Sequence, residues 1–196
     1  MVQARARVRG ESVLAERFAL FAECLLTGVW IAVASLGVLT WPAALAAGTR
    51  HLRRRAAHRA GGAREFTADV RDAVRGGWAV GLAGWAALGL AWFDVRAVRA
   101  GLPGGPLIGA VVLVALLGFA VAVLRAAARW TPDARWRTLL AAAGRRTVLD
   151  PAGSFLLVAG LAVVGCSGWF VAPLAIPVLG AVAAAAVAVE ERHRPC

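Results

Sequence analysis

The stretch LGVLTWPAALAAGTRHLRRRAAHRA, residues 36–60, begins as an apolar segment and ends as a block of arginines. It completes an apolar run that starts at Phe18 and is interrupted only by Glu23. About 20 consecutive apolar residues are enough to cross the hydrocarbon core of a bilayer. The run 18–41 therefore predicts a membrane span, and the arginines that follow it predict the cytoplasmic side of that membrane.

The composition agrees with a membrane protein, because 60% of the 196 residues are hydrophobic, whereas about half is usual for a soluble domain. All 22 basic residues are arginine, and the formal net charge is +11. The arginines lie between apolar runs and not on a separate domain. We therefore interpret them as membrane-flanking charges and not as a nucleic-acid-binding surface.

Four further apolar runs follow the first, at residues 77–93, 106–124, 152–170 and 172–189. Pro106 and the pair Asp150–Pro151 suit the first turns of helices. Pro42 either ends the first span or begins a new helix at an angle to it. The sequence thus predicts an all-α, polytopic membrane helical bundle, a single domain over residues 1–196 with about five transmembrane helices.

The arginines also predict the orientation of the spans. Loop 42–76 carries eight arginines and loop 125–150 carries six, so both are expected in the cytoplasm, whereas loop 94–105 has only Arg96 and Arg99. Five spans then place the N-terminus outside and the C-terminus inside, with sixteen arginines inside and six outside. The four arginines among the first 17 residues conflict with this arrangement. The chain has neither lysine nor tyrosine and is rich in alanine and glycine, a bias typical of a GC-rich bacterial genome. The expected location is therefore the inner (plasma) membrane of a bacterium.

Two cytoplasmic segments, residues 61–77 and 131–146, are expected to form short amphipathic helices on the membrane surface. In the second segment, Thr131 is the expected cap and Pro132 the first helical residue. The arginine block RHLRRRAAHR, residues 50–59, is expected at the lipid headgroups. Each basic residue there contributes about 1 kcal/mol of attraction to an anionic leaflet.

Three segments occur in a suggestive order. The stretch LGVLTWPAALAAGTRHLRR (36–54) places small residues around a proline before a basic helix. The stretch REFTADVRDAVRGGWAVGLAGWAALGLAWFDVR (64–96) is a basic helix that enters a span ending in Asp94, and LLAAAGRRTVLDP (139–151) precedes a proline-started span. Together, from about residue 18 to 189, they resemble the YesL family of bacterial integral membrane proteins, which has no established activity. The chain departs from the family pattern in lacking tyrosine and lysine.

The resemblance implies a limited function. Members of that family often occur beside genes of carbohydrate uptake and degradation, including ABC importers. It therefore implies an integral membrane protein, not an enzyme, that is accessory to ABC-type carbohydrate uptake. The lipid bilayer is the expected partner, together with importer subunits or a second copy of the chain. The alternative is a small transporter or channel in its own right, which would need a polar path at mid-membrane depth.

Two carboxylates are the first candidates for a functional role. Glu23 lies inside the first span, near its expected outer end, and a carboxylate in a membrane is a candidate proton relay or ion ligand. The sequence names no basic partner for it. Asp94 closes the second span at the outer interface, where it is either functional or a solvated residue paired with Arg96 or Arg99. Pro42, in the stretch that resembles the family, is a further candidate.

Aromatic side chains form a row on the second span, because Trp78, Trp85 and Trp92 recur every seven residues. This spacing keeps them near one face of a helix. The row either stacks on sugar rings or packs and anchors the helix at the interfaces. Gly77 and Gly81 on the same helix have the spacing that permits close contact between two helices.

Motifs for catalysis or metal binding are missing from the sequence. His51 and His58 lie among arginines without an acidic or cysteine ligand beside them, and the three cysteines lack metal-ligand spacing. The sequence contains no nucleophile elbow, no zinc-protease motif and no glycine-rich nucleotide loop. We therefore expect no catalytic site, no metal site and no cofactor.

Overall fold

The structure is a computed structural model that describes residues 18–19, 22–37, 39–57, 59, 61–100, 105–170 and 172–192. The described chain is helical throughout, apart from turns, which confirms the all-α prediction. An apolar helix, Ala22–Ser35, comes first. The helices that follow are α2 (Trp41–Ala56), α3 (Ala63–Arg99), α4 (Gly105–Arg129), α5 (Trp136–Leu149), α6 (Pro151–Phe170) and α7 (Ala172–Glu191).

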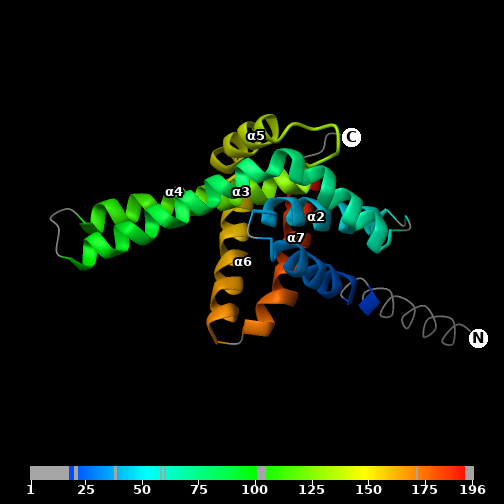
Figure 1. Ribbon diagram of the computed structural model, residues 1–196, viewed down its shortest axis with the longest axis horizontal. Helices are drawn as coiled ribbons and strands as arrows, with labels where there is room; N and C mark the ends of the chain where they lie inside the picture. Colours follow the sequence, from blue (N-terminus) through cyan, green and yellow to red (C-terminus); the bar gives the residue numbers. More distant parts are fainter. Residues whose placement is uncertain are drawn as a thin grey trace, which may run out of the picture.

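Two helical hairpins project from a common base (Figure 1). We use "base" for the region where α2, α5 and the adjoining parts of α3, α4 and α7 pack together. The α3–α4 arm is one hairpin, and the α6–α7 arm is the other, pointing in a different direction. Helix Ala22–Ser35 lies beside α2, and α5 covers the side of the base away from the α6–α7 arm.

Four helices, α3, α4, α6 and α7, are long and apolar enough to cross a membrane. They contain the predicted spans 77–93, 106–124, 152–170 and 172–189. The start predicted at Asp150–Pro151 is confirmed, because the backbone N–H of Gly153 donates to Asp150 Oδ1 at 3.0 Å, as a helix cap does. Pro177 lies inside α7.

The first predicted span, 18–41, is wrong at its C-terminal end. Helix Ala22–Ser35 stops six residues before Trp41, and at 1.5 Å per residue it reaches about 21 Å, less than the roughly 30 Å of a hydrocarbon core. The chain turns because Thr40 Oγ1 donates to the carbonyls of Ala34 at 2.6 Å and Gly37 at 2.9 Å. These contacts satisfy carbonyls at the helix end.

A new helix, α2, starts directly after the turn. Pro42 stands in its first turn, where a missing N–H costs no hydrogen bond. Pro42 was expected either to end the first span or to begin a new helix, and in the structure it begins a new helix. The chain then runs back along helix Ala22–Ser35, so that a Cβ on Gly48 of α2 would lie 2.4 Å from the Ile31 side chain.

The second correction concerns α3. The predicted surface helix 61–77 and the predicted span 77–93 are one continuous helix of 37 residues. The pair Gly76–Gly77 does not break it, because the indole of Trp136 packs on both glycines: a Cβ on Gly76 would lie 2.9 Å from Trp136 Cδ1. At the other end, the side chain of Glu65 accepts from the Gly62 N–H at 3.0 Å.

Helix α5 replaces the surface helix predicted over 131–146. It starts at Trp136 with Arg135 as its cap residue, and not at Thr131 and Pro132, which lie in a turn. Trp136 is buried, and its Nε1–H donates to the carbonyl of Ala73 on α3 at 3.1 Å. Packing of this indole in the base, and not the local cap sequence, sets where α5 starts.

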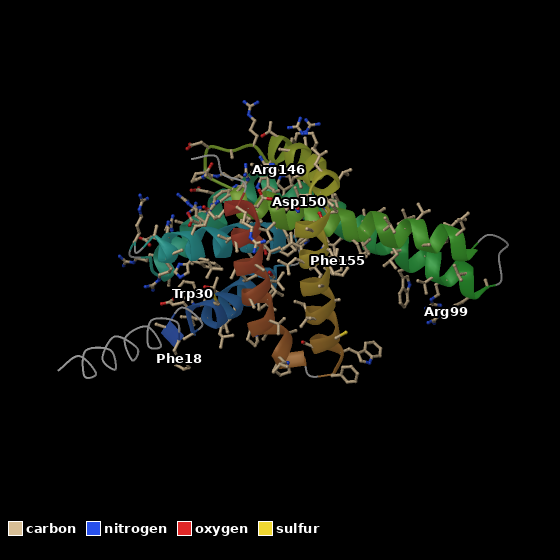
Figure 2. All side chains as sticks on the ribbon, turned by 180° about the vertical axis from the view of Figure 1, so that it is seen from behind. Phe18, Trp30, Arg99, Arg146, Asp150 and Phe155 are labelled. Atoms are coloured by element: carbon tan, nitrogen blue, oxygen red, sulfur yellow. The ribbon has the colours of Figure 1, made fainter. Side chains whose placement is uncertain are left out.

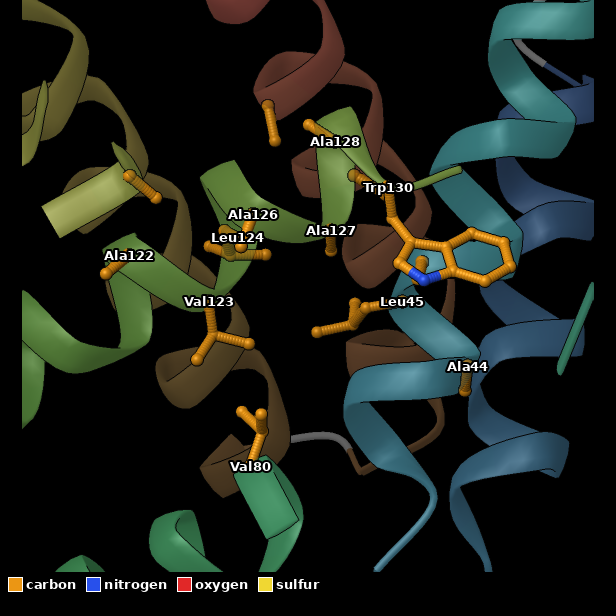
Figure 3. Packing of buried hydrophobic residues seen from close by; sticks show 14 of the residues in the cluster. Ala44, Leu45, Val80, Ala122, Val123, Leu124, Ala126, Ala127, Ala128 and Trp130 are labelled. Carbon is orange, nitrogen blue, oxygen red and sulfur yellow. The ribbon is translucent and has the colours of Figure 1, made fainter. Parts of the chain in front are cut away.

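Small side chains fill the centre of the base. Figure 3 shows Leu45 of α2 beside Ala127 near the end of α4, with Trp130 above it. The alanines at positions 43, 44, 46 and 47 of α2 are fully buried, as are most residues between Val121 and Trp130 of α4. Helices with such small side chains approach closely. This allows α2 to contact α3, α4 and α7 at once.

Candidate functional site

A cluster of five charged side chains lies where the ends of α4, α5, α6 and α7 meet. We name it the Glu190 cluster; its members are Arg125, Arg129, Arg146, Asp150 and Glu190. Glu190 Oε1 is 3.1 Å from Arg125 Nη1, and Glu190 Oε2 is 2.8 Å from Arg146 Nη1. Arg125 also reaches Asp150 Oδ2 at 2.9 Å. The cluster thus joins four helices.

Burial makes these ion pairs unusual. The side chains of Arg125 and Glu190 are 1% and 4% exposed. Removing two charges from water costs several kcal/mol per ion unless close partners and hydrogen bonds compensate. Here Arg125 has two carboxylates and the Ser154 hydroxyl around it, the latter at 3.2 Å. The cluster holds the helix ends in one arrangement, and each of its charged groups is paired with another member of the cluster.

A second cluster ties α2 to α3. Asp69, which is buried, pairs with Arg50 and with Arg54, the latter at 3.0 Å between Arg54 Nη1 and Asp69 Oδ2. Arg53 Nη2 donates to the carbonyl of Trp130 at 2.6 Å, at the end of α4. These three arginines belong to the block expected at the lipid headgroups, and their guanidinium groups bind carboxylate and carbonyl oxygens within the base.

The structure gives Glu23 the basic partners that the sequence did not name. Arg55 Nη2 lies 3.0 Å from Glu23 Oε1, and His51 Nε2 lies 3.7 Å from Glu23 Oε2. The turn at residues 36–40 produces this contact, because it brings the start of one helix beside the end of the next. Glu23 therefore lies at the arginine-rich end of α2, whereas the five-span arrangement predicted from the sequence has it at the opposite side of the membrane.

The imidazole of His51 is buried between aromatic and charged groups. Its side chain is 3% exposed, and its ring centre lies 5.4 Å from that of Trp30. Burial lowers the pKa of His51 from its ordinary value of 6.5, and the charge of Arg55 lowers it further, while Glu23 acts in the opposite direction. The net shift is downward, so the neutral imidazole is the form that the folded protein favours.

This shift predicts an acid-sensitive fold. An unfolded chain binds a proton at His51 more readily than the folded one, so stability falls as pH drops below about 6.5, by at most about 1.4 kcal/mol per pH unit. Unfolding in detergent between pH 8 and 5.5 measures the slope. We expect His51→Gln to reduce it and the control His58→Gln to keep it. Equal slopes in wild type and His51→Gln would refute the prediction.

Asp94 lies far from these clusters. It is 25 residues beyond Asp69 on the same helix, a separation of about 38 Å by helical rise. Its carboxylate faces α4, because a Cβ on Gly109 would lie 3.3 Å from Asp94 Oδ2. Among the described residues, no ion pair joins it to Arg96 or Arg99, and Arg96 stacks on Trp92 with 4.9 Å between guanidinium carbon and ring centre. The structure does not bring Glu23 and Asp94 together.

The tryptophan row lies on the outside of α3. Trp78, Trp85 and Trp92 are each about half exposed, at 51%, 47% and 63%. They therefore point mainly away from the other helices.

The remaining candidates from the sequence include Pro42, which is buried in the base at the start of α2. His58 lies outside the described residues. Within the described part of the chain, no three His, Cys, Asp or Glu side chains lie close enough together to hold a metal ion.

No protein-family model, no curated protein and no solved structure matches this chain. Inferences about its function therefore depend on the arrangement of its own residues. That arrangement combines four apolar helices with charged clusters that are confined to the base and satisfied largely by internal partners.

Proposed function

We propose that the chain is a multi-pass protein of the bacterial inner membrane with four spans, α3, α4, α6 and α7. The observation that carries the proposal is the apolar surface of the two arms. Large apolar side chains are exposed along α3, α4 and α6, and Leu174 is exposed near the start of α7. The most exposed on α6 are Phe155 at 76%, Trp169 at 87% and Phe170 at 83%. Contiguous apolar surface of this kind is unstable in water and stable in hydrocarbon.

The proposal treats helix Ala22–Ser35 and α2 as a re-entrant hairpin and not as a span. Glu23 and Arg55 lie together, so the hairpin enters and leaves on one side. Four spans then place both termini on the same side as the base. Twenty arginines are inside and only Arg96 and Arg99 are outside, compared with sixteen and six for five spans. Figure 2 shows Arg99 at the tip of the α3–α4 arm, far from Arg146 and Asp150.

The re-entrant hairpin also fits the backbone requirements of a membrane. Irregular backbone at membrane depth is tolerated only where protein covers it or water reaches it. After helix Ala22–Ser35, Leu39 lies against α3, where Gly81 leaves room for the carbonyl of Leu39. The α3–α4 arm and the α6–α7 arm point in different directions (Figure 1). For both arms to cross one flat bilayer, the two arms must lie more nearly parallel to each other in the membrane.

Cysteine accessibility tests this orientation. In a chain without its native cysteines, we expect a membrane-impermeant maleimide to label Ala100→Cys in intact cells, at the end of α3. We expect Ser12→Cys and Thr138→Cys to react only after the membrane is opened, because four spans place both inside. Labelling of Ser12→Cys in intact cells would restore the five-span arrangement, and Thr138→Cys is the matched inner control.

We propose further that the protein acts without catalysis, as an accessory of ABC-type carbohydrate uptake. The resemblance to the YesL family supports this role, as does the occupation of the charged clusters by internal partners. Affinity purification from native membranes should recover importer subunits, and a deletion strain should take up the sugar more slowly. Recovery of no importer subunit, together with normal uptake in the deletion strain, would reject the role.

The alternative, a transporter in its own right, has less support. It relied on Glu23 and Asp94 as polar residues along a path. Glu23 is bound to Arg55 near the base, and Asp94 lies near the other end of α3. A substrate flux into liposomes that is lost in both Glu23→Gln and Asp94→Asn would favour the transporter over the accessory role.

A further inference from the structure

A cavity of about 620 Å³ opens on the surface of the base, between α3 and the turn that joins α4 to α5. Three arginines contribute to its lining: Arg75 from α3, and Arg135 and Arg137 from the start of α5. Its volume lies within the range of about 300–1,000 Å³ that is usual for binding sites of small molecules. We name it the Arg135 cavity.

The Arg135 cavity carries excess positive charge. Asp72 is the one carboxylate among its lining residues, and its ion pair with Arg75 is long, at 3.6 Å, and exposed. Such a pair contributes little to stability. Neither Arg135 nor Arg137 forms an ion pair with a carboxylate of the described chain. Guanidinium groups bind phosphate oxygens in pairs of hydrogen bonds, so an anionic phosphate group is the chemistry that this lining recognises.

The wall behind the arginines is rigid and aromatic. Trp130 and Trp136 line the cavity and are buried. Trp136 is held by its hydrogen bond to the Ala73 carbonyl and by close contact with Gly76. Indole rings prefer the boundary between hydrocarbon and water, where one side of the ring is apolar and the N–H is polar. The cavity therefore presents a fixed interfacial wall with exposed charged groups around it.

The position of the cavity distinguishes a lipid from a soluble phosphate compound. Ala79 lines it, and beside Ala79 the half-exposed Trp78 begins the apolar outer surface of α3. A ligand whose phosphate contacts the arginines can therefore extend its acyl chains along this helix. The arginine block 50–59 is largely engaged within the base, so these three arginines supply positive charge toward the headgroups.

We propose that the Arg135 cavity binds the phosphate group of an anionic phospholipid at the inner leaflet, with its acyl chains along α3. The proposal rests on the membrane location proposed above. The lipid site goes beyond the proposed membrane location, because a general attraction of basic residues to an anionic membrane needs no specific binding site.

Native mass spectrometry of the protein in a neutral detergent tests the proposal, with phosphatidylglycerol and phosphatidylcholine as the probes. We expect phosphatidylglycerol to bind the wild type at least about tenfold more tightly than phosphatidylcholine. The variant Arg75→Gln/Arg135→Gln/Arg137→Gln should lose this preference. The matched control, Arg64→Gln/Arg71→Gln/Arg145→Gln, removes the same charge from exposed arginines outside the cavity, and should keep the preference within about threefold.

Three results would overturn the proposal. Equal binding of the two lipids by the wild type would show that no anionic site exists. Equal losses in both triple variants would show a general electrostatic attraction. Displacement of phosphatidylglycerol by inorganic phosphate or glycerol phosphate in modest excess would assign the cavity to a soluble phosphate compound. Failure of the membrane proposal itself would appear separately, as a protein that stays monodisperse without detergent.

Discussion

Replacing Glu190 with alanine is expected to destabilise the folded protein by about 3–5 kcal/mol, the range typical when one partner of a buried ion pair is removed. The carboxylate of Glu190 contacts three arginines from α4 and α5. Its removal leaves the guanidinium of Arg125, which is 1% exposed, with Asp150 as its one remaining carboxylate. Arg125 cannot reach water, whereas Arg129 and Arg146 are about a third exposed and can.

The comparison with a double variant separates the burial of charge from a loss of packing. In Glu190→Leu/Arg125→Leu both buried charges are gone, and apolar side chains of similar volume fill the space. We expect this variant to be more stable than Glu190→Ala, because a buried pair replaced by apolar groups is often neutral or stabilising. If the double variant instead loses about the sum of the stability losses of Glu190→Leu and Arg125→Leu measured singly, the helices are held by packing and the ionic explanation fails.

Equilibrium unfolding in detergent micelles measures these differences. Asp133→Ala is the matched control, since it removes an exposed carboxylate in the turn before α5 and is expected within about 0.5 kcal/mol of wild type. A loss of less than about 1 kcal/mol in Glu190→Ala would contradict the prediction. It would mean that water reaches Arg125 in solution.

The apolar helices were predictable from the sequence because hydrophobic runs record the medium that surrounds them. The runs that became α4, α6 and α7 lack charged residues at their centres, so nothing competes with a helical span. The Asp150–Pro151 start was predictable for a local reason as well, since the cap and the first-turn proline act within three residues.

The break at residues 36–40 could not be read in the same way. Its residues are as apolar as a span, and the hydrogen bonds of Thr40 to Ala34 and Gly37 form only once the chain has turned. Hydropathy therefore predicts one span where the structure has a helix, a turn and the start of α2. The one local signal was Pro42, which suits the first turn of a helix better than a helix interior.

The charged clusters depend on contacts between distant residues. Arg125 and Glu190 are 65 positions apart, and each lies at the end of an apolar run, where a charged residue normally meets water. Arg50 and Asp69 are joined only because α2 and α3 run in opposite directions. Periodicity and composition place such residues outside the spans and identify no partner for them. Their burial follows from the packing of the base and leaves no local pattern.

The second large effect is expected at Gly180 of α7, which touches helix Ala22–Ser35. A Cβ on Gly180 would lie 1.9 Å from the carbonyl oxygen of Cys24, and a Cβ on Gly28 would lie 2.3 Å from the carbonyl oxygen of Ile176. Both obstacles are backbone atoms of helices, so neither can rotate away as a side chain does. Two helices in contact at glycines must separate if either glycine gains a branched side chain.

Gly180→Val should therefore cost about 3 kcal/mol, the upper end of the range for overpacking, and should release the re-entrant hairpin from α7. The thiol of Cys24 reports this release: with Cys166 and Cys196 replaced by alanine, its reaction with a maleimide in detergent should become faster in the variant. Gly165→Val on α6 is the matched control, because nothing lies within 4 Å of a Cβ at that position. Because the hairpin carries Glu23, α2 and the arginines that bind Asp69, its release should also expose His51 to solvent. The acid-dependent loss of stability should then shrink in Gly180→Val.

Two unchanged measurements would contradict this prediction: the rate of the Cys24 thiol reaction, and the slope of the unfolding free energy against pH. Together they would mean that the hairpin does not depend on this glycine contact for its place in the base.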